Sequence, residues 1–502
     1  MDYSTVPSYN QYEKMHEKEY IYMENQIRKQ ATVGVFAVGH AVYWGQFPGL
    51  LDKLMGYHKD FVRLLERQGV NVIDFGMSDS SEAAYEMLRR IKGCDVDLLF
   101  CNMVTYATSS VFAPIARDAG LPIVLTALQP LSHLDYSQAN TRMQLENDCI
   151  CAVPEFTGVA KRLGHPIRDC IIGKLYDDPE VERQLDAWCR IARVLHNLHG
   201  ARIGLIGHTM EAMYDMHTDP TAASAAFGIH VPLLEINEIV AMYNAVKPED
   251  TTALAARIDA TFDTPDPVSD PVTMKLTPED REHAIRAAAA LNAFVEKHHL
   301  TGLAYYYEGQ PESEESAVVS SFIVGNSLLI EDGYPMCGEY DLKTCVAMLI
   351  LDRLGIGGSF AEFHPIDFSE DFILVGHDGP HHIAIAEGKP VLRSLKKYHG
   401  KPGHGASVEF KIKEGPITML GISQTPDGQF RFVIGEGYSK AGPIPPTGNT
   451  NTRGFFAPTT REFMKKWVME GPTHHFALGI GHHADEIAKI AEILGVPAVI
   501  VR

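Results

Sequence analysis

Carboxylates and imidazoles gather in four short segments in the last third of this 502-residue chain. They are GEYDLKT at 338–344, FAEFH at 360–364, GHDGP at 376–380 and GPTHHF at 471–476. Mixed carboxylate and imidazole ligands suit a divalent ion such as Mn²⁺, Co²⁺ or Mg²⁺ better than a metal that prefers thiolates. Such an ion can chelate neighbouring sugar oxygens and polarise a carbonyl, while carboxylates with tuned pKa values move a proton between adjacent carbons. The segments therefore indicate aldose–ketose isomerisation chemistry.

Each segment also has a purely structural interpretation. Glu339 stands where we expect a helix to begin, and the helix dipole alone would stabilise a carboxylate there. His377, at the end of a predicted strand, is typical of a surface residue, and His-His pairs occur elsewhere in the chain as well. Glu362 differs, because it stands between two phenylalanines where an unpaired carboxylate would be costly, and this setting favours a cation partner.

The common cofactor fingerprints are missing from the sequence. No G-x-G-x-x-G follows a predicted strand, and no G-x-x-x-x-G-K-[ST], H-E-x-x-H or G-x-S-x-G occurs. We therefore expect the predicted parallel sheets to bind no dinucleotide or nucleotide in the usual way.

Composition limits the classes of partner. Hydrophobic residues make up 45% and charged residues 22% of the chain, as in an ordinary soluble globular protein. The count of 44 Lys+Arg against 64 Asp+Glu gives a net charge of −20, which argues against a large nucleic-acid surface. No apolar run reaches the roughly 20 residues of a membrane span, and the N-terminus carries no signal-peptide pattern. We expect a cytoplasmic protein with no membrane partner, whose eight cysteines are mostly buried, reduced thiols.

The elements that must position these residues follow a clear order. Continuously apolar segments alternate with helical patterns through the first 135 residues, which predicts a parallel sheet covered on both faces. The expected strands are 33–39, 70–76, 96–104 and 121–128, and the expected helices are 50–68, 80–92 and 110–118.

The alternation restarts in the middle of the chain and then changes character. Strands are expected within 200–210, 229–236 and 300–309, and helices over 179–199 and 278–299. After about residue 356, short β-type segments separated by Gly, Pro and Asp predict an antiparallel barrel or sandwich, closed by a helix over 483–494 and a last strand. The predicted fold class is α/β, with two doubly wound parallel-sheet domains, 1–175 and 176–335, followed by a C-terminal β-barrel domain, 336–502.

The four segments resemble the motifs of one family. GEYDLKT is similar to that family's G-E-G-D-W-K-T, and FAEFHPIDF at 360–368 is similar to F-M-E-D-Y-T-Y-H-F. GHDGP lies where the family has G-S-H, and GPTHHF lies where it has G-G-A-H-H-T. In the order and spacing of these motifs the chain resembles the L-arabinose isomerase branch of the L-arabinose/L-fucose isomerase superfamily, with GEYDLKT as the most specific match.

The resemblance implies a metal centre and its ligands. Glu339, Glu362, His377 and His475 would ligate the metal, typically Mn²⁺, and the two glutamates would also be the catalytic acid/base pair of an enediol mechanism. His474 is the alternative ligand to His475; otherwise it would line the sugar pocket.

Further substrate-binding positions follow from the resemblance. Glu308, Met210 and Gln129 would lie in the sugar pocket. The family's members are homo-oligomers, often hexamers, in which the N-terminal domain of one chain caps the site of another. Here Tyr43 and Trp44, together with His40, would be the capping residues.

The same N-terminal segment departs from the family. The family's G-S-Q-x-L-Y-G appears as GHAVYWG at 39–45, so that Ala41 replaces a substrate-contacting glutamine and Trp44 is added. A pocket that loses a hydrogen-bonding side chain commonly changes its preference among sugars. The resemblance therefore predicts the chemistry and leaves the sugar open.

Two other functions fit the same residues. A metal-dependent lyase or epimerase acting on a sugar or sugar acid would use the same carboxylates. A non-catalytic sugar-binding protein would need no pair of glutamates. Product analysis separates the first from an isomerase, and replacing a glutamate by Gln separates the second.

Overall fold

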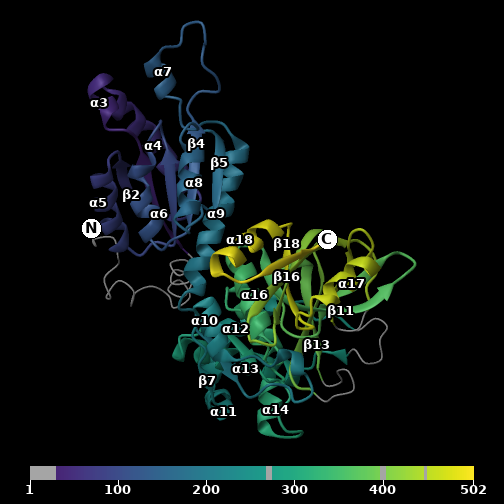
Figure 1. Cartoon of the computed structure of the whole chain (residues 1–502). Helices are drawn as coiled ribbons and strands as arrows, with labels where there is room; N and C mark the ends of the chain where they lie inside the picture. The colour runs from purple at the N-terminus through teal and green to yellow at the C-terminus, as the bar shows by residue number, and fades with distance from the viewer. Residues whose placement is uncertain (1–29, 267–273, 396–402, 446–448) are drawn as a thin grey trace. The chain divides into compact units, whose positions relative to one another are not determined.

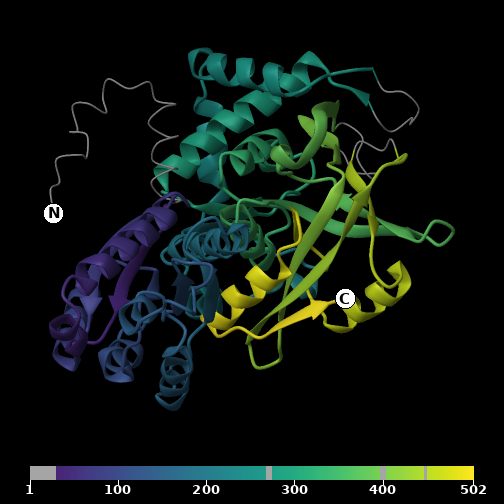
Figure 2. The ribbon, with the colours of Figure 1, turned by 90° about the horizontal axis from the view of Figure 1, so that it is seen from above.

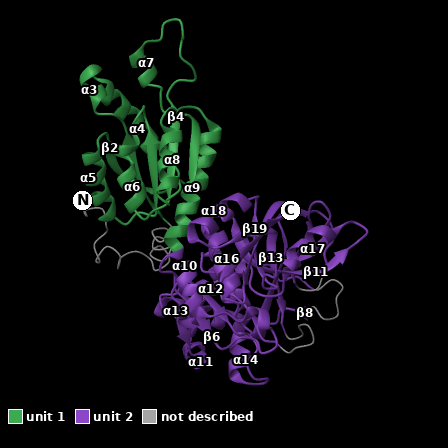
Figure 3. Ribbon diagram, viewed as in Figure 1, with its two compact units in different colours: residues 1–197 green, residues 198–502 purple. Residues whose placement is uncertain are grey.

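The computed structural model describes residues 30–266, 274–395, 403–445 and 449–502, and the chain divides into two compact units (Figures 1 and 3). The first unit comprises residues 1–197 and the second residues 198–502. Among the described residues, no helix is long and apolar enough to cross a membrane.

The first unit contains a five-stranded parallel sheet in the order β2-β1-β3-β4-β5. The strands are β1 (Thr32–Val38), β2 (Asn71–Ser78), β3 (Leu98–Met103), β4 (Ile123–Gln129) and β5 (Asp169–Lys174). The central strands β1, β3 and β4 are buried almost throughout, as expected for strands covered on both faces, whereas the edge strand β2 is partly exposed.

Helices separate these strands along the chain and follow the last of them. They are α3 (Val42–Gln46), α4 (Leu50–Glu66), α5 (Ser81–Lys92), α6 (Ala113–Asp118), α7 (Thr141–Leu145), α8 (Val153–Arg162) and α9 (Pro179–Leu198). The side chain of Ser80 caps α5 by accepting a hydrogen bond from the Ala83 amide. The predicted helices over 50–68, 80–92 and 179–199 are confirmed, whereas strand β5 was not predicted.

The second unit begins with a four-stranded parallel sheet in the order β10-β9-β6-β7. Its strands are short: β6 (Ile203–Ile206), β7 (Leu233–Leu234), β9 (Gly302–Tyr305) and β10 (Met336–Cys337). The flanking helices are α10 (Pro220–Phe227), α11 (Ile236–Ala245), α12 (Pro248–Thr261), α13 (Pro278–Lys297), α14 (Glu314–Val319) and α15 (Ile323–Glu331). The capping box of Thr277 and Asp280 starts α13 where the sequence predicted.

A closed antiparallel barrel occupies the rest of the second unit. Around the ring, β16 (Phe430–Lys440) pairs with β15 (Gly415–Gln424), β15 with β18 (Phe476–Ile480), and β18 with β11 (Gly357–Asp367). β11 pairs with β12 (Phe372–His377), β12 with β17 (Thr450–Phe455), and β17 returns to β16.

Further elements extend this sheet. β14 (Ala406–Ile412) joins β17, and β13 (Ala386–Ser394) and β8 (Met274–Lys275) continue outward. On the other side β19 (Ala498–Val501) pairs with β16, and the C-terminal helix α18 (Ala484–Leu494) contacts both strands (Figure 2). Helix α17 (Thr460–Met469) lies between β17 and β18 along the chain.

Helix α16 (Leu342–Arg353) links the two halves of the second unit. It is buried along nearly its whole length and contacts β9 and β10 of the parallel sheet as well as β11, β15 and β18 of the barrel. The predicted fold class, two parallel-sheet parts followed by an antiparallel barrel, is confirmed. The predicted domain boundaries at 175 and 335 stay predictions. The segment TPDPVSDP at 264–271 is typical of a surface loop, and most of it lies outside the described residues.

Candidate metal centre

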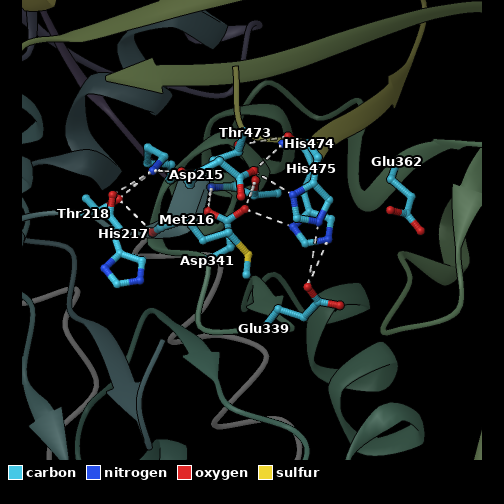
Figure 4. Close-up of polar contacts among 12 residues, drawn as sticks. Asp215, Met216, His217, Thr218, Glu339, Asp341, Glu362, Thr473, His474 and His475 are labelled. Atoms are coloured by element: carbon cyan, nitrogen blue, oxygen red, sulfur yellow. Dashed lines mark hydrogen bonds and ion pairs between the residues drawn. The ribbon is translucent and has the colours of Figure 1, made fainter. Parts of the chain in front are cut away.

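Glu339 lies in a strained turn between β10 and α16. Glu339 has φ 58° and Tyr340 has φ 62°, both in the left-handed region that non-glycine residues rarely adopt. Two such residues in succession store strain, which a folded chain retains mainly at functional sites. The helix starts only after Asp341, so the helix dipole is not what explains Glu339. The turn instead directs its carboxylate toward two imidazoles (Figure 4).

Asp341 caps the helix and fixes the ring of His475. Its fully buried carboxylate accepts hydrogen bonds from Thr344 N at 3.1 Å and Thr344 Oγ1 at 2.7 Å, and it lies 3.2 Å from His475 Nδ1. Burial alone would raise the pKa of Asp341, but the His475 hydrogen bond and the nearby charges outweigh it and lower the pKa. An ionised carboxylate only accepts, so His475 Nδ1 carries the proton and Nε2 keeps its lone pair.

The state of His475 suits a metal ligand. Its ring is fully buried, and burial holds its pKa below the ordinary value although the hydrogen bond to Asp341 raises it. The imidazole is therefore neutral, which is the form that coordinates metals. Phe360 packs against the ring at a centroid distance of 4.3 Å and restricts its rotation.

Strand register brings Glu362 to the same place. In β11, Ala361 and Phe363 pack with the barrel core, so the alternation along the strand puts Glu362 on the opposite face. On one side Ala361 pairs with Phe476 of β18, the residue that follows His475. On the other side Glu362 pairs with Gly376 of β12, the residue before His377. Glu362 is therefore placed between the two imidazoles.

His377 ends β12 and faces Glu362. Its Nε2 lies 3.8 Å from Glu362 Oε1, and its Nδ1 lies 3.1 Å from Asp378 Oδ1 and 2.8 Å from the Gly379 amide nitrogen. The two Nδ1 contacts require opposite protonation. Only the Asp378 contact puts a proton on Nδ1 and leaves Nε2 free, so it is the one compatible with ligation. Burial would lower the pKa of His377, but Asp378 and Glu362 outweigh it and the pKa is raised.

His474 lies at the more exposed side of the centre. Asp215, on a short 3₁₀ helix (Tyr214–Met216) after β6, contacts its Nδ1 at 2.7 Å and its backbone nitrogen at 3.0 Å. The hydrogen bond from His474 holds the pKa of Asp215 well below its ordinary value. His474 Nε2 is 3.9 Å from Glu339 Oε2, and its side chain is 38% exposed, whereas that of His475 is fully buried.

The donor atoms form two overlapping groups that could hold a metal ion. One consists of Glu339, His474 and His475, and the other of Glu362, His377 and His475; within each group the ligand atoms lie within 4.8 Å of one another. His475 Nε2 and Glu339 Oε2 lie 3.5 Å apart, and both are buried without a hydrogen-bond partner among the described residues. Unpaired buried polar atoms are costly, and a cation held between these two would give both of them a partner.

The other predicted substrate-binding residues lie in two places. Met210 follows β6 and is buried, and Glu308 follows β9 and contacts the Tyr307 hydroxyl at 3.2 Å. Because β6, β9 and β10 are parallel, these residues and Glu339 follow the carboxyl ends of strands at one edge of the sheet.

The remaining predicted residues belong to the first unit. Gln129 ends β4, and Tyr43 and Trp44 lie on α3, which follows β1 where the strand order reverses. Trp44 Nε1 donates to Asp79 Oδ2 at 2.7 Å, and the Tyr43 ring contacts His40 at a centroid distance of 5.2 Å. Their predicted role as caps of another chain's site stays a prediction.

Sequence reasoning missed the residues that orient the imidazoles. Asp341 and Lys343 lie within the GEYDLKT motif but were assigned no role, and the position of Asp341 directly before an apolar helix was the available signal for a cap. Asp215 offered no signal, because it lies 259 residues from His474 along the chain.

The chain is similar to known sugar isomerases. The family described as L-fucose isomerase, C-terminal domain, matches residues 391–502. A protein of Nocardioides sp. named L-arabinose isomerase is 28% identical over 400 residues, which is 74% of this chain and 75% of the relative. A Yersinia pestis protein of the same name is 24% identical over 358 residues, or 68% and 67% of the two chains.

Together the fold, the site and these relatives define an enzyme of the aldose–ketose isomerase class, as predicted. These matches support the resemblance to the L-arabinose/L-fucose isomerase superfamily that the motifs indicated.

Proposed function

We propose that the chain is a divalent-metal-dependent aldose–ketose isomerase of free sugars, with Glu339, Glu362, His377 and His475 as metal ligands. One observation carries the proposal: the unpartnered buried atoms of Glu339 and His475 face each other beside a second carboxylate–imidazole pair. The donor set of carboxylate oxygens and neutral imidazole nitrogens suits Mn²⁺, with Co²⁺ and Mg²⁺ as alternatives. When bound, the ion supplies Lewis acidity toward the sugar oxygens.

In the proposed mechanism the two glutamates move the proton. Isomerisation takes a proton from C2 of the aldose and returns one to C1, while the O2 proton is transferred to O1 through an enediol. Glu339 and Glu362 approach the imidazoles from different elements, a strained turn and a barrel strand, so one carboxylate can accept a proton while the other donates one. His474, more exposed than His475, lines the sugar side, and Met210 and Glu308 contribute at the same edge.

The proposal also covers the identity of the sugar substrate and the oligomeric state of the chain. The relatives are named for L-arabinose, which is therefore the first sugar to test, followed by other free pentoses, hexoses and deoxy sugars. Ala41 and Trp44 replace the family pattern at the predicted cap, which favours a sugar preference different from that of these relatives. We also propose a homo-oligomer, a hexamer by resemblance, in which Gln129, Tyr43 and Trp44 contact the sugar bound at another chain's centre.

The decisive experiment assays EDTA-treated protein with a panel of aldoses and ketoses, with and without added Mn²⁺. We expect interconversion of one aldose–ketose pair that is lost on metal removal and restored by Mn²⁺. Activity that is indifferent to metal would overturn the metal dependence. Products with fewer carbons or with only an inverted stereocentre would instead indicate a lyase or an epimerase.

Variants test the assigned carboxylates. Glu339→Gln and Glu362→Gln should each lower kcat by at least about 100-fold, because each removes a ligand and a proton carrier. The matched control is Glu238→Gln, since Glu238 pairs with Lys297 and His298 away from the centre and should leave kcat unchanged. Sugar binding that persists without turnover even in the native chain would favour a binding protein.

A further inference from the structure

We propose that Asp215 is a positioning residue that fixes His474 against the sugar side of the centre. The inference rests on the proposed function and deepens it, because it assigns His474 to the substrate and His475 to the metal. It also gives a role to a carboxylate that lies outside the motifs and far from them in sequence.

The contacts of Asp215 determine both the peptide and the ring of His474. One oxygen, Oδ2, accepts from the backbone nitrogen at 3.0 Å and from Nδ1 at 2.7 Å. Two hydrogen bonds to one residue leave its ring little freedom to rotate about χ1. Because an ionised carboxylate only accepts, Nδ1 carries a proton, and Nε2 is the ring nitrogen that faces Glu339 at 3.9 Å.

Lys343 in turn holds the segment that carries Asp215. Its ammonium donates to the carbonyls of Asp215 at 2.8 Å and His217 at 3.3 Å, and to Thr218 Oγ1 at 2.8 Å. Lys343 is buried, and burial lowers its pKa. All three donors of the ammonium are used on the loop after β6, so this lysine serves to anchor the loop.

The start of α16 therefore orients both imidazoles. Asp341 contacts His475 Nδ1 directly, and Lys343, two residues later, acts on His474 through the segment of Asp215. Each ring is thus held by an aspartate at Nδ1, and each Nε2 faces the same carboxylate oxygen of Glu339, at 3.5 and 3.9 Å (Figure 4).

Exposure separates the roles of the two rings. His475 is fully buried and belongs to both candidate ligand groups, whereas His474 is 38% exposed and belongs to one. The exposed ring is the one that an entering sugar can reach. Because Asp215 engages Nδ1, Nε2 is the ring nitrogen that remains available for a hydrogen bond with a sugar oxygen.

The test compares Asp215→Ala, which removes both contacts, with Asp215→Asn, which keeps one acceptor oxygen. Loss of a partner that orients an active-site imidazole typically costs 10- to 100-fold, and we expect kcat/KM of Asp215→Ala to fall by about that factor. Asp215→Asn should recover about half of this loss on a logarithmic scale. The Kd for Mn²⁺ alone, measured by calorimetry, should stay within about twofold of the native value in both variants.

Two controls isolate the route through His474. If Asp215 acts only by positioning that ring, the double variant with His474→Ala should be no worse than His474→Ala alone. Asp219→Ala removes a neighbouring helix cap, the acceptor for Thr221 N at 2.8 Å, and keeps both contacts of Asp215 with His474, so it should leave kcat/KM nearly native. Additive losses in the double variant, or an equal loss in Asp219→Ala, would overturn the proposal.

Failure of this inference is distinguishable from failure of the proposed function. If the native chain isomerises no sugar, the proposed function fails, and crystal structures of native protein and Asp215→Ala still test the positioning. We expect the His474 ring to leave Glu339 in the variant; an unmoved ring would refute the role of Asp215. A tenfold weaker Mn²⁺ affinity in Asp215→Ala would refute the assignment of His474 to the sugar.

Discussion

Replacing Asp341 by Asn should weaken both metal binding and the cap of α16, and the two effects can be measured separately. The native carboxylate uses both oxygens, for Thr344 and for His475. Asparagine keeps one oxygen for the cap but presents an NH₂ group where His475 Nδ1–H and the Thr344 hydroxyl need an acceptor. A buried donor left unsatisfied costs about 1–3 kcal/mol. Metal affinity should fall about 10- to 100-fold because the ring is no longer oriented.

The loss of metal affinity can be measured as a change in the free energy of unfolding, because an ion that binds only the folded chain stabilises it. At saturating concentration, the metal raises the free energy of unfolding in proportion to the logarithm of metal concentration over Kd. A Kd that is 10- to 100-fold weaker should therefore reduce this metal-dependent increase by about 1.4–2.7 kcal/mol. Urea denaturation at one protein concentration, with EDTA and with Mn²⁺, measures the increment directly. Thr459→Ala is the matched control, because it removes the cap of α17 at Glu462 N and should cost about 1 kcal/mol with the increment unchanged. If Asp341→Asn loses equal stability in both conditions, Asp341 is only a helix cap and the reasoning is refuted.

Three further predictions concern the scaffold. Gly376→Ala places a Cβ 1.8 Å from the Thr450 carbonyl oxygen, so we expect a loss of about 3 kcal/mol in urea denaturation together with weaker Mn²⁺ binding. Gly56→Ala, in α4 with open space at its Cβ, should instead raise the free energy of unfolding by about 0.5–1 kcal/mol, and a loss there would contradict the helix. The hydrogen bond to Asp97 raises the pKa of His196 above its ordinary 6.5, so its stabilising effect is complete below that value and lost as pH rises through the folded pKa. His196→Gln should therefore destabilise the chain more at about pH 5.5 than at about pH 8.5, and an equal effect at both would exclude a charged His196.

The parts of the fold that sequence predicted are those with strong local patterns. The buried strands β1, β3 and β4 are continuous apolar runs, and α13 carries its own cap. β17, which closes the barrel, has the sequence TNTRGF and no apolar alternation, yet its first five residues are buried. Its polar side chains find partners in other parts of the chain, as Thr452 does with Ser439 at 2.5 Å. Such a strand is visible only once the tertiary structure exists.

In the candidate site, too, the features with a local sequence pattern were predicted and those set by tertiary structure were not. The segments of Glu339, Glu362, His377 and the histidine pair were found because each carries chemistry in a short motif, and the structure brings them together. The orientation of each ring depends on partners set by folding. Asp378 is adjacent to its histidine in sequence, whereas Asp341 and Asp215 meet theirs across 134 and 259 residues. No local spacing contains that information.

Pairing of Glu362 with Gly376 across β11 and β12 has a consequence for folding fidelity. A slip of these strands by one position would send Glu362 to the face that Ala361 and Phe363 occupy, and His377 would lose its carboxylate neighbour. Only a correctly aligned barrel can assemble the centre. Occupancy by an ion would therefore report on the quality of folding, and misaligned chains could be sorted from native ones by affinity for metal alone.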